Sequence, residues 1–121
     1  MAELSRFQKL VAEAKKNIKE ISPNDALHEV GFGAATLIDV RSNEDWDAGH
    51  ARGAKHIARG EIEVEIEAQV PDLDQRIICY CGGGSRSALV TASLQKMGYR
   101  NVRSMTGGFR GWKAAGLPTE A

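Results

Sequence analysis

The stretch that decides the fold of this chain is residues 76–98, RIICYCGGGSRSALVTASLQKMG. Its short apolar beginning, residues 76–80, is rich in β-branched side chains and predicts a buried strand. Residues 87–97 favour a helix that Gly98 would end, so residues 81–86 form the turn from strand to helix. Turns at the carboxyl ends of parallel strands are where open α/β sheets bind ligands. This turn is therefore the first candidate for a functional site.

Two more short runs of β-branched and apolar residues occur at 36–40 (TLIDV) and 101–105 (NVRSM). Segments able to form helices separate these runs, and that alternation predicts an α/β domain with a parallel sheet and crossover helices. One such helix has clear boundaries, because Ser22 is a good N-cap, Pro23 suits the first helical position and Gly31 suits the end.

Residues 61–70, EIEVEIEAQV, fit two patterns. The strict alternation of polar and apolar residues is typical of a strand, but Ile62, Ile66 and Val70 also form a helical stripe. Glutamate is a good helix former and is depleted in strands, so we favour a helix that stops before Pro71.

The N-terminal segment has apolar residues at helical spacing, and Ser5 with Gln8 forms a candidate capping box. We expect residues 1–21 to form an amphipathic helix packed on the domain, and residues 22–121 to form that domain. Docking of a partner by this helix is the alternative. The apolar positions are Leu4, Phe7, Leu10, Val11, Ala14, Ile18 and Ile21.

Composition limits the function classes. The 121 residues suit one domain, and 16 basic residues balance 16 acidic ones, so no overall field attracts nucleic acid or an anionic membrane. No apolar run approaches the roughly 20 residues of a membrane helix. We expect a cytoplasmic protein with neither nucleic acid nor membrane as partner.

The glycine-rich turn has the features of an anion cradle. Gly82, Gly83 and Gly84 let the backbone curl so that N–H groups from Gly82 to Ser87 point into one concavity, and the new helix adds its positive dipole end. Two such hydrogen bonds, at about 1.5 kcal/mol each, would stabilise a thiolate appreciably. We therefore expect Cys81 to be a nucleophile and Arg86 to give electrostatic support. An inert buried thiol is the alternative.

Six features of the sequence together resemble a single-domain rhodanese, from about residue 20 to Pro118. The resemblance implies a three-layer α/β domain with a central, mainly parallel five-stranded sheet flanked by helices. The features are Leu37-Ile-Asp-Val-Arg41, Glu44 with Trp46, Gly49-His50 with Gly53-Ala54, Cys81-Gly-Gly-Gly-Ser-Arg-Ser87, Gly98-Tyr-Arg-Asn-Val102, and Gly107-Gly-Phe-Arg-Gly-Trp112.

The resemblance also implies sulfurtransferase chemistry with a persulfide on Cys81. The donor would be thiosulfate, a related small sulfur-containing anion or a protein persulfide, and the acceptor cyanide or a thiol. The amides of Gly82, Gly83, Gly84, Ser85, Arg86 and Ser87 would hold the terminal sulfur. No metal or organic cofactor is expected.

Two alternatives stay open. Cysteine phosphatases and arsenate reductases share the cysteine, cradle and arginine, but typical phosphatases have five residues between Cys and Arg, whereas four separate Cys81 from Arg86. A non-enzymatic rhodanese-like module for binding or regulation is the other alternative.

The residues around the cradle are candidates for supporting or structural roles. Asp39 and Arg41 could face the pocket, although a salt bridge that caps the strand is the simpler expectation, and Glu44 could pair with Arg86. Cys79 is expected to be a core residue, with a resolving thiol as the alternative. We expect His50 to stabilise a turn and Trp112 to pack in the core. Arg52, Arg59 and Arg110 could together attract an anionic donor. Ala51-Arg52 and His56-Ile57-Ala58 depart from the usual family pattern.

Overall fold

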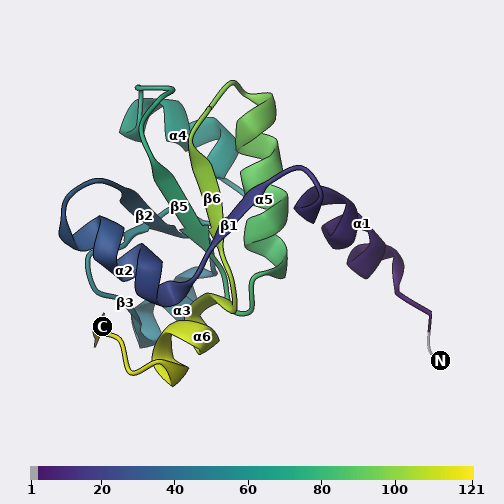
Figure 1. The fold of residues 1–121 in the computed structure, drawn as a ribbon. Helices are drawn as coiled ribbons and strands as arrows, with labels where there is room; N and C mark the ends of the chain where they lie inside the picture. Colours follow the sequence, from purple (N-terminus) through teal and green to yellow (C-terminus); the bar gives the residue numbers. More distant parts are fainter. Residues whose placement is uncertain (1–2) are drawn as a thin grey trace.

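The strand at the centre of the sequence pattern, β5 (Ile77–Tyr80), is the middle strand of a five-stranded sheet in the computed structural model, which describes residues 3–121 (Figure 1). The strand order is β1-β6-β5-β2-β4, and each neighbouring pair is parallel. This arrangement confirms the predicted fold class. The other strands are β1 (Lys19–Ile21), β2 (Thr36–Asp39), β4 (Lys55–His56) and β6 (Val102–Met105).

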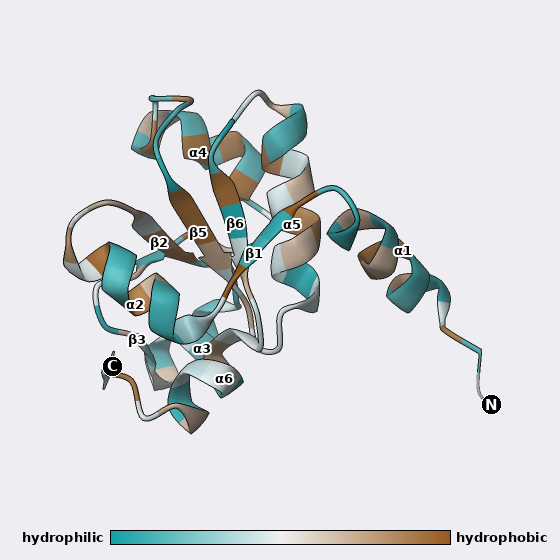
Figure 2. Cartoon of the chain, in the orientation of Figure 1, coloured by the Kyte–Doolittle hydropathy of each residue, from teal (hydrophilic) through white to brown (hydrophobic). Residues whose placement is uncertain are grey.

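Helices cover both faces of the sheet. Because alternate side chains of each central strand point to opposite sides, the two faces have separate cores. Ile77 and Cys79 belong to the core under α4 (Ile62–Gln69) and α5 (Ser85–Lys96). Ile78 and Tyr80 belong to the core under α2 (Pro23–Gly31) and α6 (Gly108–Ala114). The central strands are accordingly hydrophobic along much of their length in Figure 2.

A small second sheet lies beside the main one. It pairs β3 (His50–Ala51) with the C-terminal β7 (Thr119–Glu120) in antiparallel fashion and follows α3 (Asn43–Ala48). The expected core residue Trp112 is fully buried, and its indole N–H donates to the carbonyl of Pro118 at 2.8 Å. The C-terminal segment is thereby held against α6.

Most helix boundaries agree with the sequence patterns. Residues 61–70 contain α4, as favoured, and the Ser22 hydroxyl caps α2 by accepting from the Asp25 amide at 3.2 Å. Helix α5 begins at Ser85, two residues before its expected start.

The N-terminal expectation was wrong in extent. The capping box of Ser5 and Gln8 is present, but α1 (Arg6–Lys15) ends well before Ile21. Residues 19–21 instead form the edge strand β1, because pairing with β6 satisfies their backbone groups and buries Ile21. Helix α1 packs against α5 and extends away from the sheet (Figure 1). Residues 1 and 2 lie outside the described part, and the division at residue 21 stays a prediction.

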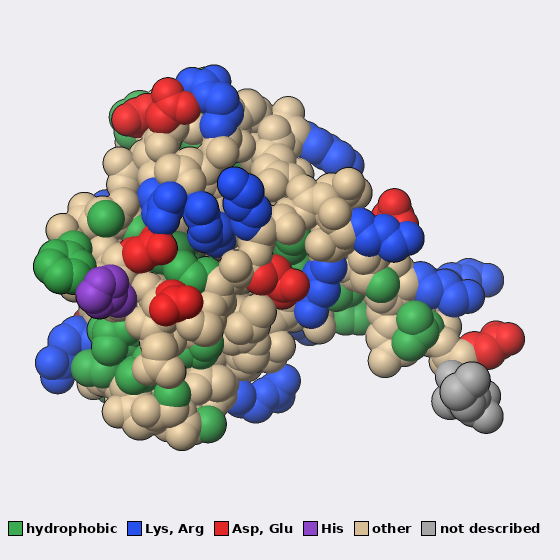
Figure 3. Space-filling view, viewed as in Figure 1, with side chains coloured by type: hydrophobic (Ala, Val, Ile, Leu, Met, Phe, Trp, Pro, Cys, Tyr) green, Lys and Arg blue, Asp and Glu red, His purple; other side chains and the backbone are tan. Residues whose placement is uncertain are grey.

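Charged side chains of both signs are mixed over the face seen in Figure 3. This agrees with the balanced composition of the chain. None of the helices in residues 3–121 is long and apolar enough to cross a membrane.

Candidate active site

The carboxyl end of β5 delivers Cys81 into a cradle of backbone amides, which we define as residues 81–87. The amide of Gly84 donates to Cys81 Sγ at 3.1 Å, and the amide of Ser87 donates to it at 3.4 Å. Helix α6 holds the cradle from below, since the amides of Phe109 and Arg110 donate to the carbonyls of Cys81 and Gly82 at 2.8 and 3.1 Å. Strand β5 and helix α6 thus together fix the position of the Cys81 sulfur.

These contacts favour the ionised form of Cys81. Burial by itself raises the pKa of the thiol, because the side chain is only 4% exposed. Hydrogen bonds from the Ser87 hydroxyl and from the amides of Ser87, Gly83 and Gly84 outweigh burial, so the pKa lies below its ordinary value. Such a shift is typical of nucleophilic cysteines.

A pair of buried hydroxyls lies behind the sulfur. Ser87 Oγ is 3.5 Å from Cys81 Sγ and 2.8 Å from Ser104 Oγ, and both serines have no exposed surface. When the sulfur is a thiolate, Ser87 must donate to it and accept from Ser104, since each hydroxyl has one proton. Sequence reasoning missed Ser104. It reaches Ser87 because β6 pairs in register with β5, where Ser104 neighbours Cys79.

Three positions around the cradle are occupied by glycine, each for a different physical reason. Gly84 is the N-cap of α5 with φ +100°, a left-handed conformation that disfavours other residues. Gly108 has φ +57°, and a Cβ there would lie 2.5 Å from the Cys81 carbonyl oxygen and 2.7 Å from Gly83 N. A Cβ at Gly83, by contrast, would overlap the guanidinium of Arg110. Close packing of α6 on the cradle therefore requires Gly108, whose role the sequence did not reveal.

An open pocket of about 270 Å³ leads to Cys81. This volume is just below the range of roughly 300–1,000 Å³ found for pockets that bind drug-sized ligands, so it suits a small substrate. Arg86 and Arg110 line it, and so does Phe7 from α1. Arg59 lines a separate groove between α1 and α5, and Arg52 does not line the pocket. Of the three arginines expected to attract an anion, only Arg110 is thus placed at the cradle.

Comparison with known proteins identifies the family of this chain. The family model described as "Rhodanese-like domain" matches residues 22–115. This chain belongs to the rhodanese-like domain family. The thiosulfate sulfurtransferase GlpE of Actinobacillus succinogenes is 38% identical over 104 residues, which cover 84% of this chain and 89% of that protein.

Two solved structures are similar to this rhodanese-like domain. A protein of unknown function from Rhodopseudomonas palustris, described as a possible tyrosine phosphatase, has a TM-score of 0.83 and 30% identity over 99% of both chains. The polysulfide-sulfur transferase homodimer of Wolinella succinogenes has a TM-score of 0.81 and 28% identity. Its match covers 94% of this chain and 86% of the other.

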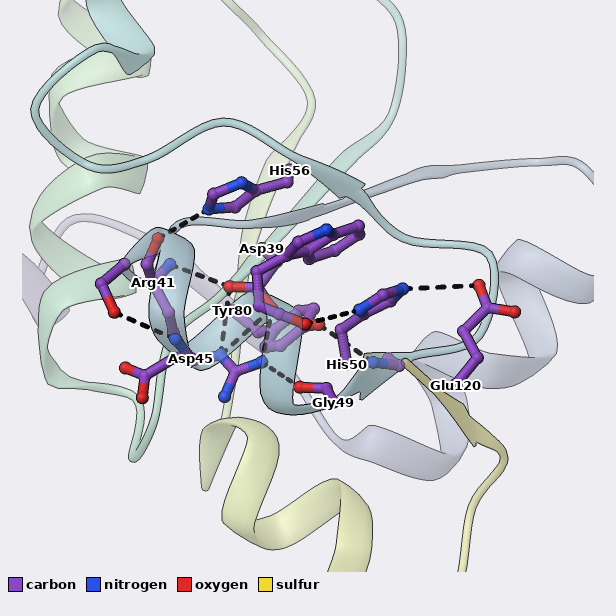
Figure 4. A network of polar contacts seen from close by, with 11 residues as sticks. Asp39, Arg41, Asp45, Gly49, His50, His56, Tyr80 and Glu120 are labelled. Atoms are coloured by element: carbon purple, nitrogen blue, oxygen red, sulfur yellow. Dashed lines mark hydrogen bonds and ion pairs between the residues drawn. The ribbon is translucent and has the colours of Figure 1, made fainter.

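Asp39 and Arg41 of this rhodanese-like domain form a buried ion pair beside the cradle (Figure 4). Arg41 Nη2 donates to Asp39 Oδ2 at 2.8 Å and to the Gly49 carbonyl at 2.6 Å, and its Cζ lies 4.3 Å from the Phe109 ring centroid. Burial lowers the pKa of Arg41, but the hydrogen bond and charge of Asp39 outweigh it, so the pKa is raised. Neither side chain lines the pocket, which agrees with the expectation that the pair forms a salt bridge at the end of the strand.

The suggested pairing of Glu44 with Arg86 is wrong for this structure. Within residues 3–121 these side chains form no ion pair, and Glu44 is exposed at the start of α3. The reason is geometric: Arg86 extends from α5 at the mouth of the pocket, whereas α3 follows β2 on the side of the Asp39–Arg41 pair.

The histidines have structural contacts. His50 Nδ1 is 3.0 Å from the carbonyl oxygen of Trp46 and must donate to it, because a carbonyl only accepts, and the two rings stack at 3.4 Å. His56 Nε2 likewise donates to the Arg41 carbonyl at 2.8 Å. No three His, Cys, Asp or Glu side chains in the described chain are grouped to hold a metal ion.

Cys79 is a fully buried core residue between the strands. Burial is the main reason that its pKa is raised to about 12, and the nearby Cys81 adds to the effect. Both cysteines are free thiols. A neutral, enclosed thiol is a poor nucleophile, which disfavours the resolving role for Cys79.

Proposed function

We propose that this protein is a sulfurtransferase that carries sulfane sulfur as a persulfide on Cys81. The observation that carries the proposal is the cradle around Cys81 Sγ, in which two amides and a hydroxyl favour the thiolate. The similarity to thiosulfate sulfurtransferases of the GlpE type supports the same chemistry.

In the proposed first step the Cys81 thiolate attacks the outer sulfur of thiosulfate. A new S–S bond forms to Cys81, the S–S bond of thiosulfate breaks, and its electron pair leaves with sulfite. The persulfide keeps one negative charge, which the amides of Gly84 and Ser87 and those of the rest of the cradle stabilise. No proton transfer or cofactor is needed to balance the step.

In the second step a thiophile attacks the terminal sulfur and restores the Cys81 thiolate. Cyanide or a thiol can serve as acceptor, and a protein persulfide can replace thiosulfate as donor. The amides of the cradle donate to sulfur, so they do not distinguish the rest of the donor or acceptor. Arg86 supports the anionic donor from the mouth of the pocket. Asp39 and Arg41 support the site indirectly, by fixing the end of β2 next to β5.

Incubation with thiosulfate followed by intact-mass analysis tests this function. We expect the wild-type protein to gain one sulfur atom, and Cys81→Ala to gain none. Cys79→Ala is the matched control and should still be loaded, since Cys79 is enclosed in the core. Absence of any adduct with thiosulfate and other sulfane donors would overturn the proposal.

A second assay addresses the phosphatase alternative, which the description of the Rhodopseudomonas palustris neighbour brings forward. A phosphate monoester and thiosulfate are offered to the same preparation. Four residues separate Cys81 from Arg86, and this shorter loop suits one sulfur atom better than a tetrahedral phosphate. We expect release of sulfite without hydrolysis of the ester; the reverse result would favour a phosphatase.

A further inference from the structure

Helix α1 is weakly fastened to the rest of the domain. It packs against α5, and Val11 is its single buried side chain. Within residues 3–121 no hydrogen bond joins α1 to α5, and the ion pair from Lys15 to Glu20 of β1, with 3.8 Å between Nζ and Oε2, links two exposed residues. Apolar packing therefore holds α1 on α5, and three residues, 16–18, connect it to β1.

The apolar side chains at the start of the chain are largely left in solvent. Leu4, Phe7 and Leu10 recur at helical spacing and are 53%, 44% and 58% exposed. Beside them an open groove of about 670 Å³ lies between α1 and α5, with polar and charged residues along much of its lining. The apolar lining residues of the groove come from both helices and are Leu10, Ala14, Leu89 and Ala92. A side chain that is exposed next to an apolar hollow gains burial from a small movement of its helix.

The same helix borders the entrance to Cys81. Phe7 lines the pocket of about 270 Å³ together with Arg86 of α5 and Arg110 of α6. Helix α5 begins within the cradle, and amides of α6 donate to the cradle carbonyls, so these two helices cannot move without displacing the groups that hold the sulfur. Helix α1 has no such bond, and its movement changes the width of the entrance alone.

We propose that α1 is a lid over Cys81, which turns about residues 16–18 and moves Leu10 into the groove and Phe7 across the entrance. Phe7 and Leu10 are three residues apart on one face of the helix, so a single rotation moves both side chains toward α5. The groove and the pocket are both open in this structure, which is therefore the open position of the lid. The connection at residues 16–18 is short and lies at the end of α1, as is usual for a hinge.

Sulfur on Cys81 gives the closed lid an additional contact. The terminal sulfur of a persulfide lies one bond further into the pocket that Phe7 borders. An aromatic ring has a positive edge, and sulfur near that edge is a favourable contact. Because this contact exists only when the lid is closed, loading of Cys81 shifts the population toward the closed position. Closure then keeps water and small thiols away from the persulfide. This inference deepens the proposed sulfurtransferase function and rests on it for the persulfide.

Hydrogen exchange of the α1 amides, followed by mass spectrometry, measures how often the lid opens. Loading of the wild type with thiosulfate should slow this exchange roughly two- to tenfold, because exchange scales with the open fraction. Cys81→Ser treated in the same way, and the α2 peptide of the wild type, are the controls and should not change. Equal exchange of α1 before and after loading would overturn the coupling between the sulfur and the lid.

A chemical mimic of the loaded state makes the test independent of sulfur transfer. The Cys81 thiolate attacks the methylthio sulfur of methyl methanethiosulfonate, the S–S bond of the reagent breaks, and its electron pair leaves with methanesulfinate. The resulting Cys81–S–S–CH₃ places a second sulfur in the pocket without a sulfane donor. Exchange of α1 should slow in this form too, and unchanged or faster exchange would overturn the lid.

Two variants test the closing movement itself. Leu10→Asp should prevent closure, because a carboxylate resists burial in the groove. The loaded variant should lose its sulfur to glutathione roughly two- to tenfold faster than the wild type, as measured by intact mass, because access scales with the open fraction. Phe7→Ala removes the side chain that crosses the entrance and should have the same effect. Leu4→Asp is the matched control, since Leu4 is similarly exposed but lines neither the groove nor the pocket.

Sulfur loss at the wild-type rate in either variant, or an equal increase in the control, would contradict the inference. Alkylation of unloaded Cys81 by iodoacetamide should match the wild type in Leu10→Asp, because Leu10 does not line the pocket. If no donor adds sulfur to Cys81, the sulfurtransferase function fails, and the methylthio form decides the lid by itself. If thiosulfate loads Cys81 but neither α1 exchange nor sulfur loss responds, only the lid fails.

Discussion

The hydroxyl of Ser87 should control how much of Cys81 is ionised, and Ser87→Ala tests this directly. The substitution removes the Oγ that lies 3.5 Å from Cys81 Sγ. It keeps the amide of residue 87 at 3.4 Å and the amide of Gly84 at 3.1 Å. The cradle therefore loses one of its stabilising contacts while its backbone stays in place.

The expected magnitude follows from the geometry. A hydrogen bond to a charged group contributes about 1.5–3 kcal/mol, and the long O···S distance puts this one near or below the lower end. A loss of about 1 kcal/mol reduces the thiolate population roughly fivefold wherever the thiol is mostly protonated. The pKa of Cys81 should rise toward its ordinary value, because hydroxyl and amide contacts are what lower it.

The rate of alkylation by iodoacetamide, followed by intact mass across a pH series, measures the thiolate. We expect the rate profile of Ser87→Ala to move to higher pH and the rate on its acidic side to fall roughly fivefold. Ser93→Ala, further along α5, is the matched control. An unchanged profile, or an equal change in the control, would refute the reasoning.

The same substitution has a predictable cost in stability. It leaves the Ser104 hydroxyl buried without its partner at 2.8 Å, which should lower the free energy of unfolding by about 1–3 kcal/mol. Replacing Ser104 by alanine as well removes the unsatisfied group, so urea unfolding should show that the double variant recovers part of the loss. A double variant as unstable as the sum of both singles would argue against a coupled pair.

Four further predictions concern stability and reactivity. Because the folded pKa of Cys81 is lowered, its ionisation stabilises the fold above the unfolded pKa, and this contribution is lost as pH falls through the folded pKa. In urea unfolding, the free energy of unfolding of the wild type should therefore increase relative to that of Cys81→Ser as pH rises between the two pKa values. Cys79, with its pKa near 12 and no exposed surface, should resist iodoacetamide at pH 8 in the folded protein and react in urea, and equal labelling of both cysteines would contradict this. Gly108→Ala should cost at least about 3 kcal/mol, since it combines φ +57° with backbone overlap, and thermal unfolding near wild type would exclude this argument. Asp39→Ala should cost about 3 kcal/mol, because Arg41 keeps its hydrogen bond to the Gly49 carbonyl but loses its carboxylate partner; an unchanged melting temperature would contradict this.

Local patterns were sufficient to predict much of the architecture. The runs at 36–40, 76–80 and 101–105 became β2, β5 and β6, since short apolar runs bounded by turns leave few other ways to bury their side chains. The N-terminal helix was overextended because residues 19–21 continue its apolar spacing. Their pairing with β6 depends on a strand some eighty residues away, which helical periodicity cannot reveal.

The candidate site also contains residues that the sequence revealed and residues that only the structure showed. Cys81, its glycines and Arg86 were visible because strand, turn and helix are consecutive in the chain. The roles of Ser104 and Gly108 were not, because nothing local distinguishes a serine that contacts Ser87 from any other serine in a strand. Glu44 shows the opposite error, in which proximity to a motif suggested a contact that the fold does not make.

The sequence by itself determined the cysteine that we propose as the nucleophile and the backbone that surrounds it. A cysteine followed by GGGSRS between a strand and a helix has amides nearby that lack intrahelical partners at the helix start, so these amides are available to bind the sulfur. The tertiary structure decided what lies around that cradle. Parallel pairing brought Ser104 behind the sulfur, and packing of α6 and α1 brought Arg110 and Phe7 to its mouth. Side chains distant in sequence meet only after the sheet has set their register and the helices have packed, so these contacts belong to the fold and not to the motif.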